Sequence, residues 1–172
     1  MTVLKRSNAW SEWGSNWTYQ SERARGEYYL AAGKPVAAEL SFVRGLSAID
    51  KRVEAFEAGL YKDSTRRVHS RQAVYFNKAI ILNRLANSLF AQRKLTEAEY
   101  YYRLALKTFL MVGSRNSVAV AGVLNGLSHA VAEQGRVEES LLLSKYALNS
   151  SIESGVSESS TNMIYGRRSH AA

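Results

Sequence analysis

Basic side chains are concentrated in residues 62–94, where they could bind an acidic surface or phosphate groups. The basic residues of this stretch are Lys62, Arg66, Arg67, Arg71, Lys78, Arg84, Arg93 and Lys94. Asp63 is the only acidic residue there, so the stretch carries +7 of the chain's net charge of +8. This asymmetry predicts a partner of opposite charge.

The expected basic patch lies on one long helix. Its members are Lys62, Arg66, Arg67, Arg71 and Lys78. On a helix, Arg67, Arg71 and Lys78 share a face, and the other two lie close by if the helix extends back. In the alternative interpretation, acids of a neighbouring helix, such as Glu54 and Glu57, pair with this face. We favour an acidic partner because so large an excess of charge is difficult to neutralise internally.

The sequence contains no arrangement typical of catalysis or metal binding. The histidines, His69, His129 and His170, are far apart and have no metal-ligand spacing. There is no cysteine, which excludes thiolate ligands and cysteine nucleophiles. No glycine loop could hold a phosphate. We therefore expect a protein that is not an enzyme and that uses no metal or other cofactor.

The composition is typical of one globular domain. The 172 residues are 46% apolar and 22% charged, with a single proline, so most of the chain can be helical. No apolar run approaches the roughly 20 residues that span a bilayer, and the opening residues do not form a secretory signal. We expect a soluble intracellular protein without membrane insertion, either cytoplasmic or, if a transit peptide has been removed, in an organelle such as the mitochondrial matrix.

An internal repeat determines the expected fold. Residues 82–106 and 124–148 align without a gap at an offset of 42 residues. The matched pairs include Leu82 and Leu124, Asn83 and Asn125, Ala86 and Ser128, Gln92 and Gln134, and Ala105 and Ala147. So many matches at one offset indicate a true repeat of a supersecondary unit.

The apolar spacing inside each unit is that of two helices. Leu82, Leu85, Ala86 and Leu89 form one stripe, and a second stripe holds Ala98, Tyr102, Ala105, Leu106 and Phe109. Thr96 and Glu99 predict a capping box for the second helix. In the later unit, Gly135 stands where a left-handed residue would end the first helix.

These motifs resemble the tetratricopeptide repeat family. The matching residues are Leu85, Ala86, Leu89, Ala98, Tyr102 and Ala105 in one unit and Leu127, Ser128, Val131, Gly135, Ser140 and Ala147 in the next, with Arg93 and Ser144 departing from the pattern. A weaker third match upstream is made by Gly26, Tyr29, Gly33, Ala38, Phe42, Gly45 and Leu46, and Pro35 fits the start of its second helix. The long period resembles the units of kinesin light chain.

The resemblance implies an all-α, right-handed stack of about three antiparallel helix pairs, a tetratricopeptide-like α-solenoid with capping segments. We expect a single domain with repeats over 17–60, 61–113 and 114–155 and a polar cap or tail over 156–172. The offset from Gly26 to Ala86 is 60, 18 more than one period, and we expect overlong helices over 50–77 to hold the extra residues. Trp10, Trp13 and Trp17 predict an aromatic cap at the N-terminal end, and Met163, Ile164 and Tyr165 a short C-terminal capping helix.

In this family the first helix of each unit lines a concave groove. The resemblance therefore places five residues in a partner-binding groove: Asn83, Arg84, Asn87, Asn125 and His129. An asparagine amide can both donate to and accept from the backbone of an extended peptide, and Arg84 could pair with a carboxylate. In the alternative interpretation these residues are solvated polar side chains on an exposed helix face, or they form hydrogen bonds that join one repeat to the next.

The resemblance thus implies a non-enzymatic protein–protein interaction module, an adaptor or accessory subunit of a hetero-oligomeric complex, whose partner is a peptide or an acidic protein surface. The alternative is an RNA-binding helical-repeat protein of the pentatricopeptide kind. RNA binding is disfavoured because Tyr100, Tyr101 and Tyr102 are expected to face the core, where they could not stack on bases.

Overall fold

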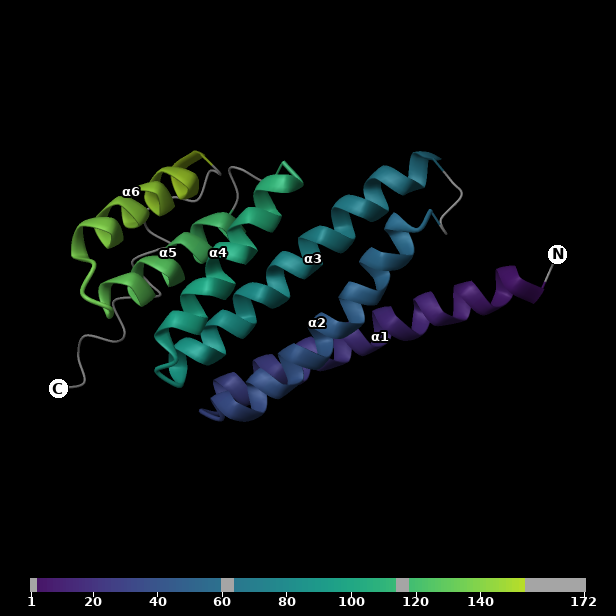
Figure 1. Cartoon of the computed structure of the whole chain (residues 1–172), viewed down its shortest axis with the longest axis horizontal. Helices are drawn as coiled ribbons and strands as arrows, with labels where there is room; N and C mark the ends of the chain where they lie inside the picture. The colour runs from purple at the N-terminus through teal and green to yellow at the C-terminus, as the bar shows by residue number, and fades with distance from the viewer. Residues whose placement is uncertain (1–2, 60–63, 114–117, 154–172) are drawn as a thin grey trace.

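A computed structural model describes residues 3–59, 64–113 and 118–153, and in this part of the chain the regular structure consists of six helices (Figure 1). They are α1 (Val3–Ala31), α2 (Pro35–Glu57), α3 (Ser64–Ala91), α4 (Leu95–Met111), α5 (Val118–Ala132) and α6 (Val137–Glu153). Side chains are described over 16–59, 71–113 and 118–152.

Consecutive helices form antiparallel pairs, and the pairs stack in chain order. The pairs α1–α2, α3–α4 and α5–α6 have the most extensive contacts, and α2 then packs on α3 and α4 on α5. Figure 1 shows the helices following one another across the molecule, with α1 and α6 at opposite ends. The predicted all-α solenoid of three helix pairs is confirmed. None of the described helices is long and apolar enough to cross a membrane.

The turn inside each pair has the same conformation three times. Gly33, Arg93 and Gly135 all have positive φ, at 69°, 64° and 84°. One residue later, the backbone N–H of Lys94 donates to the carbonyl of Leu89 at 3.0 Å, and the other two turns have the equivalent hydrogen bond. This is the pattern of a helix ending in a left-handed residue. The left-handed turn predicted at Gly135 is confirmed.

The second helices begin without a side-chain cap in two of the pairs. α2 begins at Pro35, as predicted, where a proline loses no hydrogen bond. α4 begins at Leu95 after Lys94, and no side chain caps it. The capping box predicted for Thr96 and Glu99 is therefore wrong. The carboxylate of Glu99 instead accepts hydrogen bonds from the following helix pair.

The buried core follows the predicted stripes. Leu82, Leu85, Ala86 and Leu89 of α3 are buried, as are Ala98, Tyr102, Ala105 and Phe109 of α4. Close approach of a helix to an aromatic ring depends on glycine at two places. A Cβ on Gly26 would lie 2.4 Å from the Phe42 ring, and one on Gly126 would lie 2.5 Å from the Tyr102 ring. Tyr100 departs from the prediction, because it is 62% exposed rather than packed in the core.

The extra residues of the first unit extend the helices. α1, α2 and α3 have 29, 23 and 28 residues, whereas α4, α5 and α6 have 15 to 17. Val53 and Phe56 near the end of α2 and Tyr75 on α3 are buried, so the added turns pack on each other. The predicted overlong helices are confirmed over the described residues.

The two predicted caps have different outcomes. Residues 10–17 belong to α1 itself, and Trp17 is 69% exposed rather than packed as a cap. The side chains of Trp10 and Trp13 lie outside the described part. Met163, Ile164 and Tyr165 also lie outside the described residues.

Candidate functional site

The first helices of the three pairs form a continuous wall. α1 contacts α3, and α3 contacts α5, whereas the described parts of α2, α4 and α6 have no comparable contacts with one another. The first helices therefore lie on the inner side of the curved stack and the second helices on its outer side. This inner wall is the surface on which the groove residues were predicted.

The structure places the predicted groove residues together on the inner wall. Asn83, Arg84 and Asn87 are half-buried on α3, on the side away from its buried stripe of Leu82, Leu85, Ala86 and Leu89. On α5, Asn125 is half-buried and His129 is exposed. Because Asn125 and His129 follow Asn83 and Asn87 by one period, the two helices present the same positions to the groove.

Arg84 already has an acidic neighbour inside the molecule. Its Nε lies 3.2 Å from Oε1 of Glu27 on α1, so the pair joins the first two helices of the inner wall. Both side chains remain about 40% exposed. A carboxylate of a partner would therefore compete with Glu27 for Arg84 rather than meet an unpaired cation.

Asn87 is held in place by the second helix of its own pair. The hydroxyl of Tyr102 on α4 donates a 2.6 Å hydrogen bond to Asn87 Oδ1. The Tyr102 ring also contacts Gly126 of α5, so this tyrosine connects three helices. For Asn87 Oδ1 the structural interpretation holds, and the amide N–H groups are the part of this side chain that can serve a partner.

Two polar atoms of the inner wall are buried without a hydrogen bond or ion pair in the described part of the protein. They are Asn83 Oδ1 and Arg23 Nε. Arg23 of α1 stands 60 residues before Asn83, the offset between the first two units, so it occupies the equivalent position. Buried polar atoms are nearly always hydrogen-bonded in folded proteins. Because the two side chains stand at equivalent positions, a polar ligand on the inner wall could satisfy both only if they turn toward the groove.

Much of the predicted basic stretch is paired within the fold. Lys78 lies 2.8 Å from Asp50, Arg93 lies 2.7 Å from Glu133, and Lys94 lies 3.0 Å from Glu39. Asp50 and Glu39 lie on α2 and Glu133 lies in the turn after α5, and all three differ from the predicted Glu54 and Glu57. Lys78 therefore does not stand as an unpaired member of the basic patch.

Arg71 is the one member of the predicted basic patch whose side chain is described and for which no acid among the described residues is paired. Arg71 is exposed, and its guanidinium lies 5.6 Å from the centroid of the Tyr75 ring. Lys62 and the side chains of Arg66 and Arg67 lie outside the described residues.

Two identical polar clusters join the repeats, and sequence reasoning missed both. At the first junction, Gln92 Nε2 donates to Glu39 Oε2 at 2.6 Å, and Lys94 pairs with the same carboxylate. At the second, Gln134 Nε2 donates to Glu99 Oε2 at 2.9 Å, and Arg136 pairs with Glu99. The matched glutamines at positions 92 and 134 were the feature of the sequence that could have predicted these clusters.

The junction carboxylates are held in their charged form. Burial acts to raise the pKa of Glu39, but the hydrogen bonds from Gln92 and Lys94 outweigh it and bring the pKa below 4.5. Burial likewise acts to raise the pKa of Glu99, and hydrogen bonds from Arg136, Gln134 and Arg103 lower it below 4.5. The clusters are therefore strongest when both acids are ionised.

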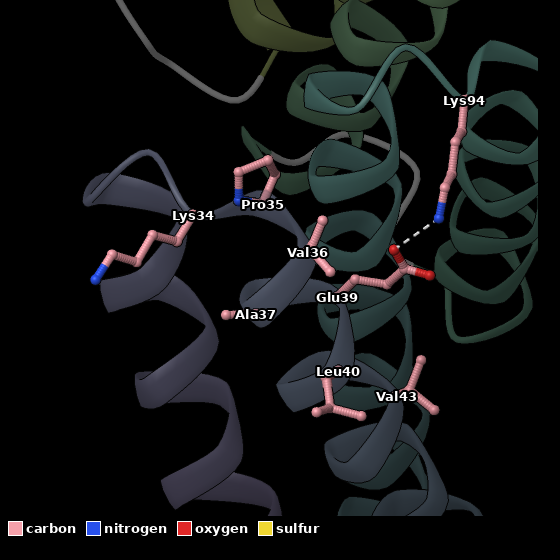
Figure 2. Close-up of a pocket in the computed structure, with 8 residues that line it drawn as sticks. All are labelled: Lys34, Pro35, Val36, Ala37, Glu39, Leu40, Val43 and Lys94. Atoms are coloured by element: carbon pink, nitrogen blue, oxygen red, sulfur yellow. Dashed lines mark hydrogen bonds and ion pairs between the residues drawn. The ribbon is translucent and has the colours of Figure 1, made fainter.

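An apolar depression lies on α2, at the turn between α3 and α4. Figure 2 shows Val36, Leu40 and Val43 beside Glu39 and its ion pair with Lys94. The depression has a volume of about 710 Å³. The three apolar side chains are exposed, so this is a second surface that a partner could cover, and no sequence pattern had indicated it.

Comparison of the sequence with protein-family models and with curated proteins gives no match. Among the described residues, no three side chains of metal-binding type are grouped closely enough to hold an ion. The function is therefore inferred from the arrangement of side chains on the inner wall.

Proposed function

We propose that this protein is a non-enzymatic interaction module, an adaptor or accessory subunit that holds an extended segment of a partner protein against its inner wall. The observation that supports this most is the gathering of polar side chains on the inner faces of α3 and α5. The tetratricopeptide-like repeat pattern agrees with this role.

The spacing of the inner-wall amides suits a peptide backbone. Residues four apart on a helix differ by about 6 Å along its axis. Alternate residues of an extended chain repeat at about 6.6 Å. Asn83 and Asn87 on α3, with Asn125 and His129 on α5, could therefore meet successive backbone groups of one extended segment. Such contacts involve the backbone and are largely independent of the peptide's sequence.

The polarity of each amide suggests its role. Asn83 Oδ1 is buried and makes no hydrogen bond in the described part of the protein, so a rotation of this amide toward the groove would let it accept from a backbone N–H of the peptide. Because Asn87 Oδ1 accepts from Tyr102, its N–H groups suit a backbone carbonyl. A carboxylate on the peptide would be attracted to Arg84 and would share it with Glu27. These features, with the net charge of +8, favour an acidic peptide.

The experiment compares one double variant with a matched control. Partners are first isolated by native pull-down and mass spectrometry, and the bound segment is synthesised as a fluorescent peptide. Asn83→Ala with Asn125→Ala should weaken binding at least tenfold, which is about 1.4 kcal/mol. Asn149→Ala makes the same chemical change at an exposed position on α6 and should leave the Kd unchanged. Equal affinities of the double variant and the parent would contradict a peptide on the inner wall.

RNA binding is the alternative that the same protein sample can test. Tyr102 is buried and cannot stack on a base, whereas Tyr100 is exposed, so the tyrosines alone do not exclude RNA. RNA binding would be favoured if the protein retains single-stranded poly(U) and this retention falls steeply with salt. Changing Arg66, Arg67 and Arg71 to glutamate should then abolish the retention.

A further inference from the structure

The ends of the stack carry the surfaces that elsewhere join one repeat to the next. At both internal junctions, a face of the second helix of one pair packs on a face of the following first helix. Helix α6 has no following pair among the described residues, and α1 has no preceding one. Corresponding positions can be identified from the offsets of 60 and 42 residues. The two end faces can therefore be compared with the internal ones, residue by residue.

The end face of α6 is apolar and open. Leu141 occupies the position of Glu39 and Glu99 and is 63% exposed, and Leu148 is 48% exposed. Ser144 is exposed at the position where Tyr102 is buried. Terminal repeats of a solenoid normally end in a polar outer face, and α6 does not.

The end face of α1 is also apolar and open. Trp17 and Tyr28 are each 69% exposed, and Ala24 is exposed between them. Ala24 is the equivalent of Arg84 on α3 and of Gly126 on α5, and on Gly126 the preceding helix α4 packs its Tyr102 ring. This stripe therefore corresponds to the surface that α5 uses to receive the pair before it.

The two end faces differ from the internal junctions at corresponding positions. At both internal junctions a glutamate meets a glutamine, as in Glu39 with Gln92. At the ends the glutamate position holds Leu141 and the glutamine position holds Ala32. Both polar partners are thus replaced by apolar residues, and neither end retains half of the hydrogen-bonded pair. A glutamate facing an alanine, or a glutamine facing a leucine, would leave a buried polar group unbonded.

Size is matched as well as polarity. The α6 face has the small Ser144 where an internal junction has the large Tyr102. The α1 face has the large Tyr28 where the internal junctions have Ser88 and Ala130, both fully buried. The α6 face therefore lacks a large side chain, and the α1 face supplies one.

We propose that the C-terminal face on α6 of one molecule binds the N-terminal face on α1 of a second copy, so that the solenoid continues from one chain into the next. The contact is heterologous, because the two surfaces differ, and it leaves one free face at each end of a pair of molecules. Assembly should therefore depend on concentration and proceed beyond the dimer. This surface is separate from the inner wall, so the proposal does not depend on the partner peptide.

The test uses two variants of the full chain that block one face each. Tyr28→Arg blocks the α1 face and Leu141→Glu blocks the α6 face. Both residues are exposed, so folding should be preserved, and circular dichroism checks this. Light scattering and sedimentation should show the parent exceeding 19.2 kDa with a mass that rises with concentration. Each variant alone should be a monomer. An equimolar mixture should form one dimer, because each variant retains the face that the other has lost.

A second pair of changes rebuilds an internal junction between copies. Leu141→Glu combined with Ala32→Gln introduces the glutamate and glutamine that join the internal repeats, and self-association should return. A parent that is monomeric at all concentrations would overturn the proposal. A Tyr28→Arg variant that still forms a dimer alone would also overturn it, because that would indicate a symmetric α6–α6 contact. So would a mixture of the two variants that stays monomeric.

Discussion

The side-chain amide of Gln92 donates a 2.6 Å hydrogen bond to the carboxylate of Glu39, 53 residues earlier in the chain. The same bond recurs between Gln134 and Glu99 at the next junction. In each case a basic residue two positions after the glutamine, Lys94 or Arg136, pairs with the same carboxylate. The unit that repeats is therefore a helix pair together with its polar junction to the next pair.

These junctions predict a loss of stability in acid. The pKa values of Glu39 and Glu99 lie below 4.5 in the folded chain. A lowered carboxyl pKa contributes stability that is fully present above the unfolded pKa and is lost as the pH falls through the folded one. The melting temperature of the double variant Glu39→Gln, Glu99→Gln should therefore fall less than that of the parent as the pH drops below about 4.5. Parallel pH profiles would show that the junctions do not depend on charge.

The turn residue Arg93 predicts a stabilising substitution. Arg93 has φ of 64°, which costs a non-glycine residue roughly 1 kcal/mol. Arg93→Gly and Arg93→Ala both remove the exposed ion pair with Glu133, so only the backbone strain differs between them. In urea unfolding the glycine variant should be more stable than the alanine variant by about 1 kcal/mol. Equal stabilities would mean that the turn relaxes in the absence of glycine.

Two glycines of α5 should respond in opposite directions to the same change. A Cβ on Gly126 would lie 2.5 Å from the buried Tyr102 ring, whereas a Cβ on Gly122 meets nothing within 4 Å. Gly126→Ala should destabilise the fold by about 1–3 kcal/mol. Gly122→Ala should stabilise it by up to about 1 kcal/mol, because alanine is the better helix former. A neutral Gly126→Ala would contradict the close packing of α4 on α5.

The hydrogen bond from Tyr102 to Asn87 predicts coupled substitutions. Tyr102→Phe keeps the ring on Gly126 but removes the hydroxyl that donates to Asn87 Oδ1. This change should lower the free energy of unfolding by about 1 kcal/mol. Asn87→Ala removes the other partner, and the double variant should cost less than the sum of the two single changes. Additive costs in a double-mutant cycle would show that the two side chains do not interact.

Much of the fold could be predicted because its signals are local. The stripe from Leu82 to Leu89 and the left-handed turn at Gly135 reflect neighbouring residues on one helix or at one helix end. The overlong helices followed from a count of residues between matched positions. Such signals report which side of a helix is buried and where the helix stops.

The partners of polar side chains could not be predicted in the same way. Glu99 looked like a local cap, but its carboxylate binds Gln134, 35 residues later. Lys78 looked like part of an open patch, but it pairs with Asp50 of α2. These pairings depend on how helices stack, which periodicity does not specify. The apolar depression at Leu40 was missed for a related reason, since an apolar stripe does not reveal whether another element covers it.

The central claim, that a partner segment lies on the inner wall, is tested most directly by photo-crosslinking. The chain has no cysteine, so one introduced thiol can carry a benzophenone label at a single position. Gly122→Cys places it on the inner side of α5, and Leu40→Cys and Asn149→Cys place it on the outer depression and on exposed α6. We predict crosslinks from position 122 to one contiguous segment of the partner and none from positions 40 and 149. Crosslinks from position 40 or 149 but not from 122 would contradict the account.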